Sequence, residues 1–314
     1  MANHDILLNS VASVADLGHA PMEEDDFRKM ADAVKRPVTQ GVSVFRPVLA
    51  APNPVEVTLP EVEPQVPMPL ALSPPRPGRV WDSLNPATLD EVKLLGKGLF
   101  TNPQQSPATT HFDMLRTRIL QAMQDHGWKR IAITSPTHGC GKSFVAANLA
   151  LSLARRPSSR TILLDLELRQ PGLARMMGLS EIGALRDFLN GDQPLESHFR
   201  RIGRTLALGL NSVPVPDAAE VLQEPATAET LDAMMAQLQP ELLVIDAPPA
   251  LVADDVLSLL PQVDAVLLII DGTRTTAKEV RACERLFEGR CPLMGVVLNR
   301  SQDFGLGRYR YGMK

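Results

Sequence analysis

One glycine-rich turn restricts the possible folds of this chain more than any other feature. An apolar run, Ile131 to Ile133, leads into Thr-Ser-Pro-Thr-His-Gly-Cys-Gly, and Lys142-Ser143 then opens a stretch of helical character. A strand, a turn in which glycines allow unusual backbone angles and a helix that starts with Lys-Ser are typical of a phosphate-binding loop. Pro136 stands where this pattern usually has its first glycine. The loop predicts a nucleoside triphosphate as ligand; the alternative is an ordinary strand-to-helix turn.

The loop supplies the groups that a magnesium-bound triphosphate requires. Backbone N–H groups and a helix amino terminus bind phosphate, while a long cation and a hydroxyl serve the phosphates and the metal. Lys142 and Ser143 are placed to supply the cation and the hydroxyl. We therefore expect ATP and Mg²⁺ as cofactors. The predicted cofactor-binding residues of the loop and the helix start are Thr137, His138, Gly139, Cys140, Gly141, Lys142, Ser143 and Phe144.

Beyond the loop, apolar runs alternate with segments of helical character. Strands of a parallel sheet are buried on both faces, and each crossover between them needs a helix, so this alternation indicates such a sheet. The sequence predicts an α/β fold with a mostly parallel, doubly wound P-loop sheet flanked by helices. The predicted strands are residues 130–135, 161–166, 206–213, 242–246, 265–271 and 293–298. Apolar residues at helical spacing predict a further helix over residues 113–124.

Two of the predicted strands end in acids. Asp165 and Glu167 lie two residues apart, so an extended chain directs both to the same side, and Asp246 ends another strand. Ligands of a parallel sheet lie beyond the carboxyl ends of its strands, so these acids should meet the loop. Carboxylates hold Mg²⁺ and its waters beside phosphates. The acids and the loop together predict a metal site made of Ser143, Asp165, Glu167 and Asp246.

Composition limits the partners and the location of the protein. The net charge of −4 and the pI near 5.9 give no reason to expect a nucleic-acid partner. The 3 cysteines lack metal-ligand spacing and favour a reducing compartment. No apolar run approaches the ~20 residues of a membrane span, and the first residues do not resemble a signal peptide. We expect a cytoplasmic protein.

Prolines divide the chain into segments. They recur from Pro37 to Pro77 and disfavour helices and strand pairing there, which predicts a disordered proline-rich extension. Upstream, residues 23–36 carry acids first and bases last, as a short helix would, and this helix is either simply solvated or a docking element. The expected organisation is an N-terminal segment over residues 1–36, a linker over 37–106, a P-loop ATP-binding domain over 107–304 and a flexible tail over 305–314.

Taken together, these motifs resemble those of a known family. The combination of the loop with Asp165-x-Glu167-x-Arg169-x-Pro171, Asp246-Ala-Pro-Pro and Val-Val-Leu-Asn299-Arg is similar to that of the bacterial tyrosine kinases, or BY-kinases, of capsule and exopolysaccharide systems. The resemblance covers residues 108–314. It implies an ATP-dependent tyrosine autokinase that regulates exopolysaccharide or capsule polymerisation or export. It also implies a homo-oligomer and, as activating partner, a transmembrane polysaccharide co-polymerase.

The resemblance also implies roles for single residues. Lys142 would bind the β- and γ-phosphates, Ser143 would ligate Mg²⁺, and Asp165 would help to activate the incoming tyrosine hydroxyl. The acids Glu167 and Asp246 would orient the metal and its waters. The resemblance thus implies catalytic roles for Lys142, Asp165, Glu167 and Asp246. Beyond the loop, Asn299 and Arg300 are the expected contacts to the nucleotide. Positioning and charge neutralisation are most of what phosphoryl transfer requires of a protein.

Both tyrosines of the chain lie in its last six residues. Members of the resembled family end in a tyrosine cluster that a neighbouring subunit phosphorylates, so Tyr309 and Tyr311 are the predicted autophosphorylation sites. Glycines around them favour a mobile tail. The alternative is a frayed end in which the aromatic residues have no function.

Some positions differ from the family pattern. Glu167 stands where aspartate is usual, and the family's Glu-x-x-Arg-x-x-Arg subunit-contact motif falls on Thr110, Asp113 and Arg116. Two alternative functions therefore remain. One is a nucleotide-binding adaptor of the co-polymerase without kinase turnover. The other is a partition-type ATPase, which the absence of that group's signature lysine at Thr137 disfavours.

Overall fold

The structure is a computed structural model that describes residues 11–12, 77–179 and 182–301. All of these residues belong to one compact unit of the chain. Most of the predicted N-terminal segment, the predicted linker up to residue 76 and the tail with Tyr309 and Tyr311 lie outside the described residues.

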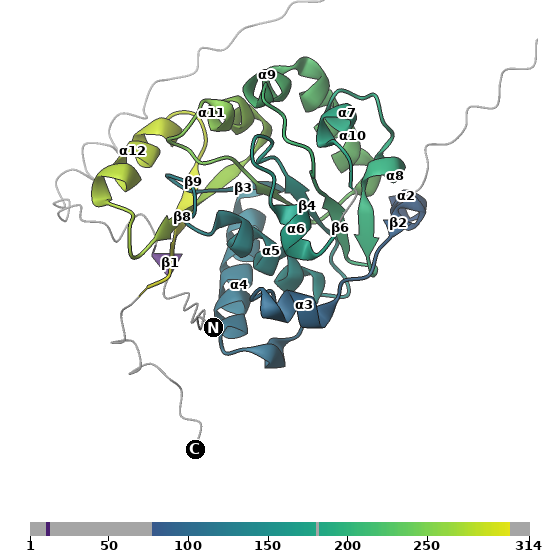
Figure 1. Cartoon of the computed structure of the whole chain (residues 1–314), viewed down its shortest axis with the longest axis horizontal. Coiled ribbons are helices and arrows are strands. Elements are labelled where there is room, and N and C mark those ends of the chain that lie inside the picture. Colours follow the sequence, from purple (N-terminus) through teal and green to yellow (C-terminus); the bar gives the residue numbers. More distant parts are fainter. Residues whose placement is uncertain (1–10, 13–76, 180–181, 302–314) are drawn as a thin grey trace, which may run out of the picture. The chain divides into compact units, whose positions relative to one another are not determined.

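A single sheet organises the described part of the chain. Its nine strands follow the order β1-β9-β8-β3-β7-β4-β6-β5-β2 (Figure 1). The strands from β9 to β6 in this order are parallel to one another, whereas β5 runs antiparallel to β6 and β1 antiparallel to β9. The strands are β1 Val11–Ala12, β2 Asn85–Pro86, β3 Arg130–Thr134, β4 Thr161–Asp165, β5 Arg200–Ile202, β6 Leu206–Gly209, β7 Leu242–Asp246, β8 Ala265–Asp271 and β9 Leu293–Asn299.

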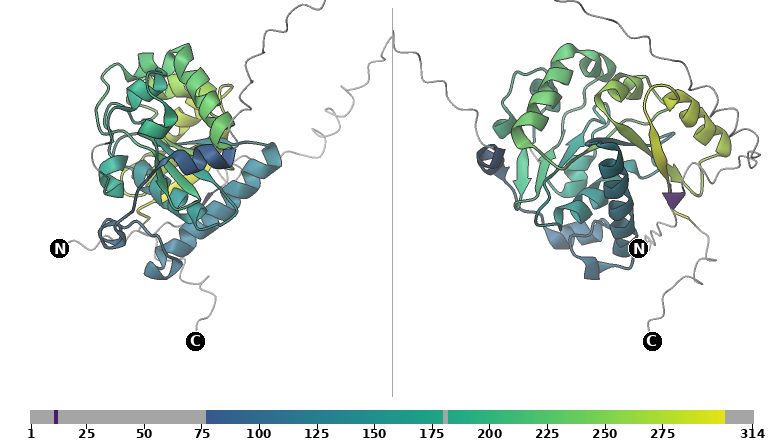
Figure 2. Two further views of the ribbon diagram at one scale, coloured as in Figure 1. Left: turned by 90° about the vertical axis from the view of Figure 1, so that its right-hand side faces the viewer. Right: turned by 180° about the vertical axis from the view of Figure 1, so that it is seen from behind.

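Helices cover both faces of this sheet. In β3, Ile131 and Ile133 join one apolar cluster with α3 to α6, while Ala132 joins a second cluster with α2 and α7 to α12. The side view in Figure 2 shows the blue α4 and the green helices on opposite sides of the sheet. The mostly parallel, doubly wound P-loop fold predicted from the sequence is therefore confirmed. The helices are α2 Pro77–Ser83, α3 Glu91–Gly96, η3 Pro103–Gln105, α4 Ala108–His126, α5 Lys142–Ala154, α6 Leu173–Met177, α7 Leu185–Leu189, α8 Leu195–His198, α9 Ala218–Gln223, α10 Pro225–Leu238, α11 Asp255–Leu259, η4 Leu260–Gln262 and α12 Ala277–Phe287.

The folded unit begins earlier than the predicted boundary at residue 107. Residues 77–106, assigned above to the linker, contain α2, β2, α3 and η3. Trp81 and Leu84 pack into one apolar cluster, while Leu94 and Leu99 pack into the other. The prolines here do not prevent folding, because Pro77 starts α2 and a helix tolerates proline in its first turn. The linker prediction is therefore wrong for this segment.

Candidate functional site

The glycine-rich turn connects β3 to α5 in a compact loop. Gly139 and Gly141 adopt φ values of 80° and 91°, in the left-handed region that favours glycine. A Cβ at Gly141 would lie 2.2 Å from the Asn299 side-chain nitrogen, so any other residue would be strained at this φ and would displace the Asn299 side chain. The Ser135 and Pro136 carbonyl oxygens accept backbone N–H groups of Ala250 and Leu251 at 2.7 and 3.0 Å.

The start of α5 offers the donors that an anion needs. Lys142 is its first residue, and the preceding Gly141 provides no side-chain cap for the N–H groups of the first turn. Uncapped N–H groups at a helix amino terminus are an anion-binding arrangement. The Phe144 ring, by contrast, packs 5.9 Å from the Phe112 ring in the core, so Phe144 can reach a ligand only through its backbone.

The predicted acids and the lysine meet at one point. Asp165 and Asp246 are register partners at the ends of the neighbouring strands β4 and β7. Lys142 Nζ lies 2.9 Å from Glu167 Oε2 and 3.3 Å from Asp246 Oδ1. All four side chains are buried, so one cation faces three carboxylates in a low-dielectric site. The four residues predicted to be catalytic are thus brought together by the fold.

Burial and mutual charge control the protonation of this cluster. Burial, reinforced by the charge of Asp246, raises the pKa of Asp165 well above its ordinary value. Burial also raises the pKa of Glu167, although Lys142 opposes this. For Lys142, burial would lower the pKa, but the carboxylates of Asp246 and Glu167 outweigh it and raise the pKa. The cluster therefore has three carboxyl groups for one lysine, and the raised pKa values of Asp165 and Glu167 reflect the cost of charging all three in a buried site.

The fit of a magnesium ion depends on the nucleotide. Asp246 Oδ2 is buried without a hydrogen-bond partner among the described residues, so it is an acceptor for a metal-bound water. Ser143 Oγ lies 3.5 Å from Lys142 Nζ, at the start of α5. Within the part of the chain that the structure describes, no group of three His, Cys, Asp or Glu residues could hold a metal ion. The residues thus fit Mg²⁺ that takes its other ligands from phosphates and water, as is usual for this ion.

Asn299 and Arg300 lie against the outer side of the loop. Asn299 Nδ2 donates to the carbonyl oxygen of Cys140 at 2.9 Å, and Arg300 Nη1 donates to that of Gly139 at 2.8 Å. Arg300 has a φ of 55°, which is uncommon for a residue other than glycine. Both residues are predicted contacts of the nucleotide. In the structure their side chains donate to the loop backbone, and that of Arg300 donates to Asp271 as well.

The remaining loop side chains occupy different positions. Thr137 Oγ1 lies 3.7 Å from Cys140 Sγ, and Cys140 is only 2% exposed. His138 is exposed. Asp271 and Arg274 also lie beside the loop and were not predicted from the sequence. The signal was present, because Asp271 ends the apolar strand β8 just as Asp246 ends β7.

Arg116, the one residue that remains of the subunit-contact motif, forms its hydrogen bonds within its own chain. Arg116 Nη1 donates to Asp113 Oδ1 at 3.1 Å and to the carbonyl oxygen of Ser152 at 3.0 Å. Arg155 also contacts Asp113. These bonds join α4 to α5, so Arg116 is already used inside the subunit.

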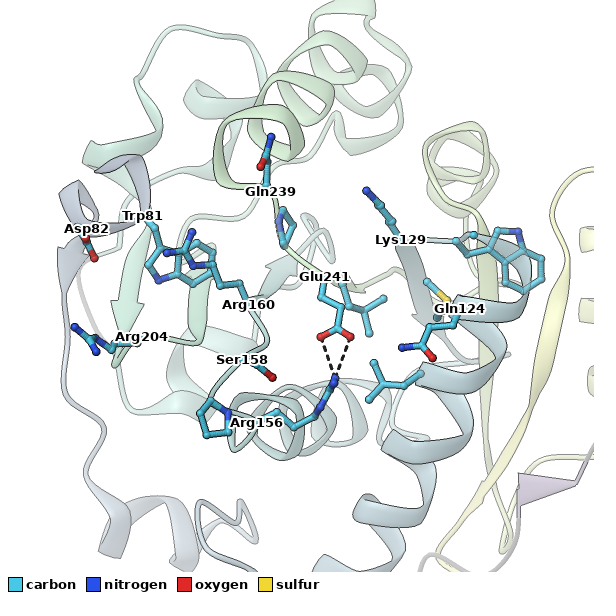
Figure 3. A pocket seen from close by; sticks show the side chains of 17 residues that line it. Trp81, Asp82, Gln124, Lys129, Arg156, Ser158, Arg160, Arg204, Gln239 and Glu241 are labelled. Carbon is cyan, nitrogen blue, oxygen red and sulfur yellow. Dashed lines mark hydrogen bonds and ion pairs between the residues drawn. The ribbon is translucent and has the colours of Figure 1, made fainter. Parts of the chain in front are cut away.

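A cavity of about 810 Å³ lies at the opposite edge of the sheet, where β3, β4 and β7 begin (Figure 3). Its lining includes four basic side chains and two acidic ones: Lys129, Arg156, Arg160, Arg204, Asp82 and Glu241. The helices α4, α5 and α10 end here, and each helix carboxyl terminus carries about half a negative charge. The charges nearly cancel, so the cavity lacks the charge excess of a phosphate site.

None of the described helices combines the length and the apolar character that crossing a bilayer requires.

Comparison with known proteins identifies relatives of this chain. The sequence model of the ParA family, described as NUBPL iron-transfer P-loop NTPase, matches residues 128–304, more than half of the chain. EpsB of Ralstonia nicotianae, whose name assigns it provisionally to the tyrosine-protein kinases, is 32% identical over 213 residues. This match covers 66% of the chain but only 27% of EpsB. The tyrosine-protein kinase YwqD of Bacillus subtilis is 29% identical over 199 residues, which cover 63% of this chain and 83% of YwqD.

Solved structures with this fold include two kinase domains. The VpsO kinase domain is 31% identical, with a TM-score of 0.54, and the match covers 60% of this chain and 92% of that one. The kinase domain of the Escherichia coli tyrosine kinase ETK is 25% identical, with a TM-score of 0.58, and the match covers 66% of this chain and 80% of that one.

Proposed function

Because this chain belongs to the ParA family of P-loop NTPases and, within it, to the bacterial tyrosine kinases, we propose that it is an ATP-dependent protein-tyrosine autokinase. We propose further that it regulates the polymerisation or export of an exopolysaccharide or capsule. The chain spans about a quarter of the length of EpsB, so the activity of that longer protein is not carried over whole.

One observation carries the proposal. A buried lysine at the first position of α5 faces three buried carboxylates from the ends of β4 and β7, directly behind the glycine-rich loop. Buried groups of like charge destabilise a fold unless a ligand of opposite charge binds to them. A magnesium-bound triphosphate supplies both the anion for the lysine and the cation for the carboxylates.

Each residue has a role in this proposal. Lys142 and the N–H groups of the loop bind the β- and γ-phosphates, and Ser143 ligates Mg²⁺. Asp246 and Glu167 hold metal-bound waters. Asp165 accepts the proton of the attacking tyrosine hydroxyl, for which its raised pKa suits it better than an ordinary aspartate.

The rest of the proposal concerns partners and location. A transmembrane polysaccharide co-polymerase would recruit the chain to the inner face of the membrane and activate it. A homo-oligomer would present the tyrosines Tyr309 and Tyr311 to a neighbouring site. Because Arg116 is held by Asp113 and Ser152, assembly would rely on contacts other than the family motif.

The test is incubation of the purified chain with ATP and Mg²⁺, followed by intact mass measurement and mapping of phosphorylated residues. We expect phosphate on tyrosine in the wild type and none in Lys142→Met, which also loses ATP binding. ATP binding without phosphotyrosine, with the partner's cytoplasmic segment present, would instead support the adaptor function. Failure to bind ATP would refute the nucleotide site itself.

A further inference from the structure

Several side chains form hydrogen bonds to the outer side of the phosphate loop, and two of them are also bound to the carboxylate of Asp271. The Gly139 carbonyl oxygen accepts a hydrogen bond from Arg274 Nη2 at 3.2 Å in addition to the one from Arg300. We call Asp271, Arg274, Asn299 and Arg300 the loop brace. Its members come from the carboxyl ends of β8 and β9, the strands beside β3 on one side.

Asp271 lies at the centre of the loop brace. Its Oδ2 accepts from Arg300 Nη1 at 2.6 Å and from Arg274 Nε at 3.2 Å. Its Oδ1 accepts from the backbone and the hydroxyl of Thr273 at 2.9 and 2.6 Å. Burial alone would raise the pKa of Asp271, but the hydrogen bonds from Thr273, Arg300 and Arg274 outweigh it and lower the pKa to about 2. The carboxylate is therefore fully charged, fully buried and fixed in one orientation.

The two arginine side chains are far more exposed to solvent than that of Asp271. Their side chains are 62% and 45% exposed, for Arg274 and Arg300 respectively, while that of Asp271 is 0% exposed. Long exposed side chains keep many rotamers unless something orders them. Asp271 is the group that orders both of them toward Gly139.

We propose that Asp271 is a positioning residue of the phosphate loop, which orients Arg274 and Arg300 so that they hold the Gly139 carbonyl outward. The N–H groups of the loop then point inward, toward phosphate, before any ligand arrives. The proposal rests on the proposed nucleotide site for its biological meaning, but the order of the loop can be measured without nucleotide.

The need for such a brace follows from the loop itself. Gly139 and Gly141 have more backbone freedom than any other residue type, so this part of the loop has little intrinsic order. The other part is tied through the carbonyls of Ser135 and Pro136 to the segment after β7. Loss of Asp271 should therefore loosen the Gly139–Gly141 part and leave the rest of the domain folded.

Cys140 provides a direct readout of this order. It lies between the two glycines and is 2% exposed, so alkylation of its thiol requires the loop to open. Cys283, which lies in α12, and Cys291 are internal controls, because both are buried in one of the two apolar clusters. Burial raises their pKa values to about 12 and about 11, which keeps them unreactive in the folded domain.

The experiment measures iodoacetamide labelling of each cysteine by peptide mass mapping, in the full chain without nucleotide. In Asp271→Asn we expect Cys140 to react about tenfold faster than in the wild type, because the opened loop is more populated. Cys283 and Cys291 should keep their rates. An unchanged rate at Cys140 overturns the proposal, and so does an equal rise at all three cysteines, which would show general unfolding.

Two further variants keep the test decisive if Asp271→Asn folds poorly. Arg274→Gln changes an exposed side chain and should accelerate Cys140 by a smaller factor, about threefold, because Arg300 still holds Gly139. Arg281→Gln removes an exposed arginine of α12 that makes no bond to the loop and should change nothing. Equal labelling of Cys140 in both variants would refute the role of the brace.

Addition of ATP and Mg²⁺ to the wild type separates this proposal from the proposed function. Protection of Cys140 by nucleotide would support the site, whereas absence of protection would count against the site. Neither result alters the comparison of the variants without nucleotide.

Discussion

Lys142 Nζ lies 2.9 Å from Glu167 Oε2, closer than it lies to the carboxylate of Asp246. The lysine that a triphosphate would require is thus already paired with the acid that differs from the family pattern. Glutamate is one methylene longer than the usual aspartate, and this length is used to reach the lysine. Phosphate oxygens must compete with Glu167 for the same ammonium group.

Replacement of Glu167 by aspartate should therefore strengthen ATP binding. The shorter side chain withdraws from Lys142, so the Kd for ATP should fall by about threefold to tenfold, equivalent to about 0.7–1.4 kcal/mol. Titration with a fluorescent ATP analogue measures this change.

Glu241→Asp is the matched control for this substitution. It makes the same chemical change in an ion pair with Arg156 at the opposite edge of the sheet, so ATP affinity should not change. A Glu167→Asp protein that binds ATP no better than the wild type would show that the glutamate does not compete with phosphate.

Neutralising Asp165 should stabilise the domain in the absence of ligand. Asp165→Asn removes a buried charge that faces Asp246. This change should raise the free energy of unfolding by about 1–2 kcal/mol and Tm by roughly 2–8 °C. Phosphotyrosine formation should be lost in the same variant. Thermal unfolding followed by circular dichroism, together with phosphate mapping, tests both effects.

The stability that Asp165→Asn gains over the wild type should depend on pH in a definite direction. Burial and the charge of Asp246 raise the pKa of Asp165 above its ordinary value of 3.8, so the folded wild type binds this proton more tightly than the unfolded chain. Its stability therefore falls, relative to Asp165→Asn, as pH rises from the ordinary value through the raised one. The advantage of the variant should be small in acid and grow toward neutral pH. A gain that is constant across this window would contradict the electrostatic explanation.

Leu94→Ala should destabilise the domain by about 2–4 kcal/mol, because it leaves a cavity in the cluster shared with α4 and α5. Leu94 is 1% exposed, whereas its neighbour Leu95 is 44% exposed. Leu95→Ala is thus the matched control and should cost less than about 0.5 kcal/mol. Urea unfolding of both variants gives the comparison. Similar stabilities would mean that residues 77–106 do not belong to the folded unit.

Replacement of Tyr309 and Tyr311 by phenylalanine should abolish the phosphotyrosine signal and leave ATP affinity unchanged. These are the only tyrosines of the chain, so no other residue can carry phosphotyrosine. Phosphotyrosine-specific detection after incubation with ATP and Mg²⁺ makes the measurement. Retained ATP binding with a lost signal is expected, and a change in ATP affinity would assign these residues to the binding site instead.

Local sequence patterns determined the parallel strands from β3 to β9 and the glycine-rich loop. They did not predict β1, β2 or β5, and the strand predicted over residues 206–213 ends at Gly209. The apolar runs predicted β3, β4, β7 and β8 within one residue of their observed ends, because strands buried on both faces are continuous apolar segments. Glycines before Lys142 marked the loop, since only glycine adopts its backbone angles readily. The acids at the ends of β4 and β7 could be assigned to one edge because parallel strands share their direction.

The pairing of side chains was decided by the tertiary structure alone. Strand order is a long-range property, and nothing in β8 indicates that Asp271 will meet Arg300, which lies 29 positions further along the chain. The choice of Glu167 over Asp246 as the closer partner of Lys142 likewise depends on distances of a few tenths of an ångström. Residues 77–106 lack a clear apolar period, so their place in the core became visible only where Trp81 and Leu94 contact a surface that distant parts of the chain build.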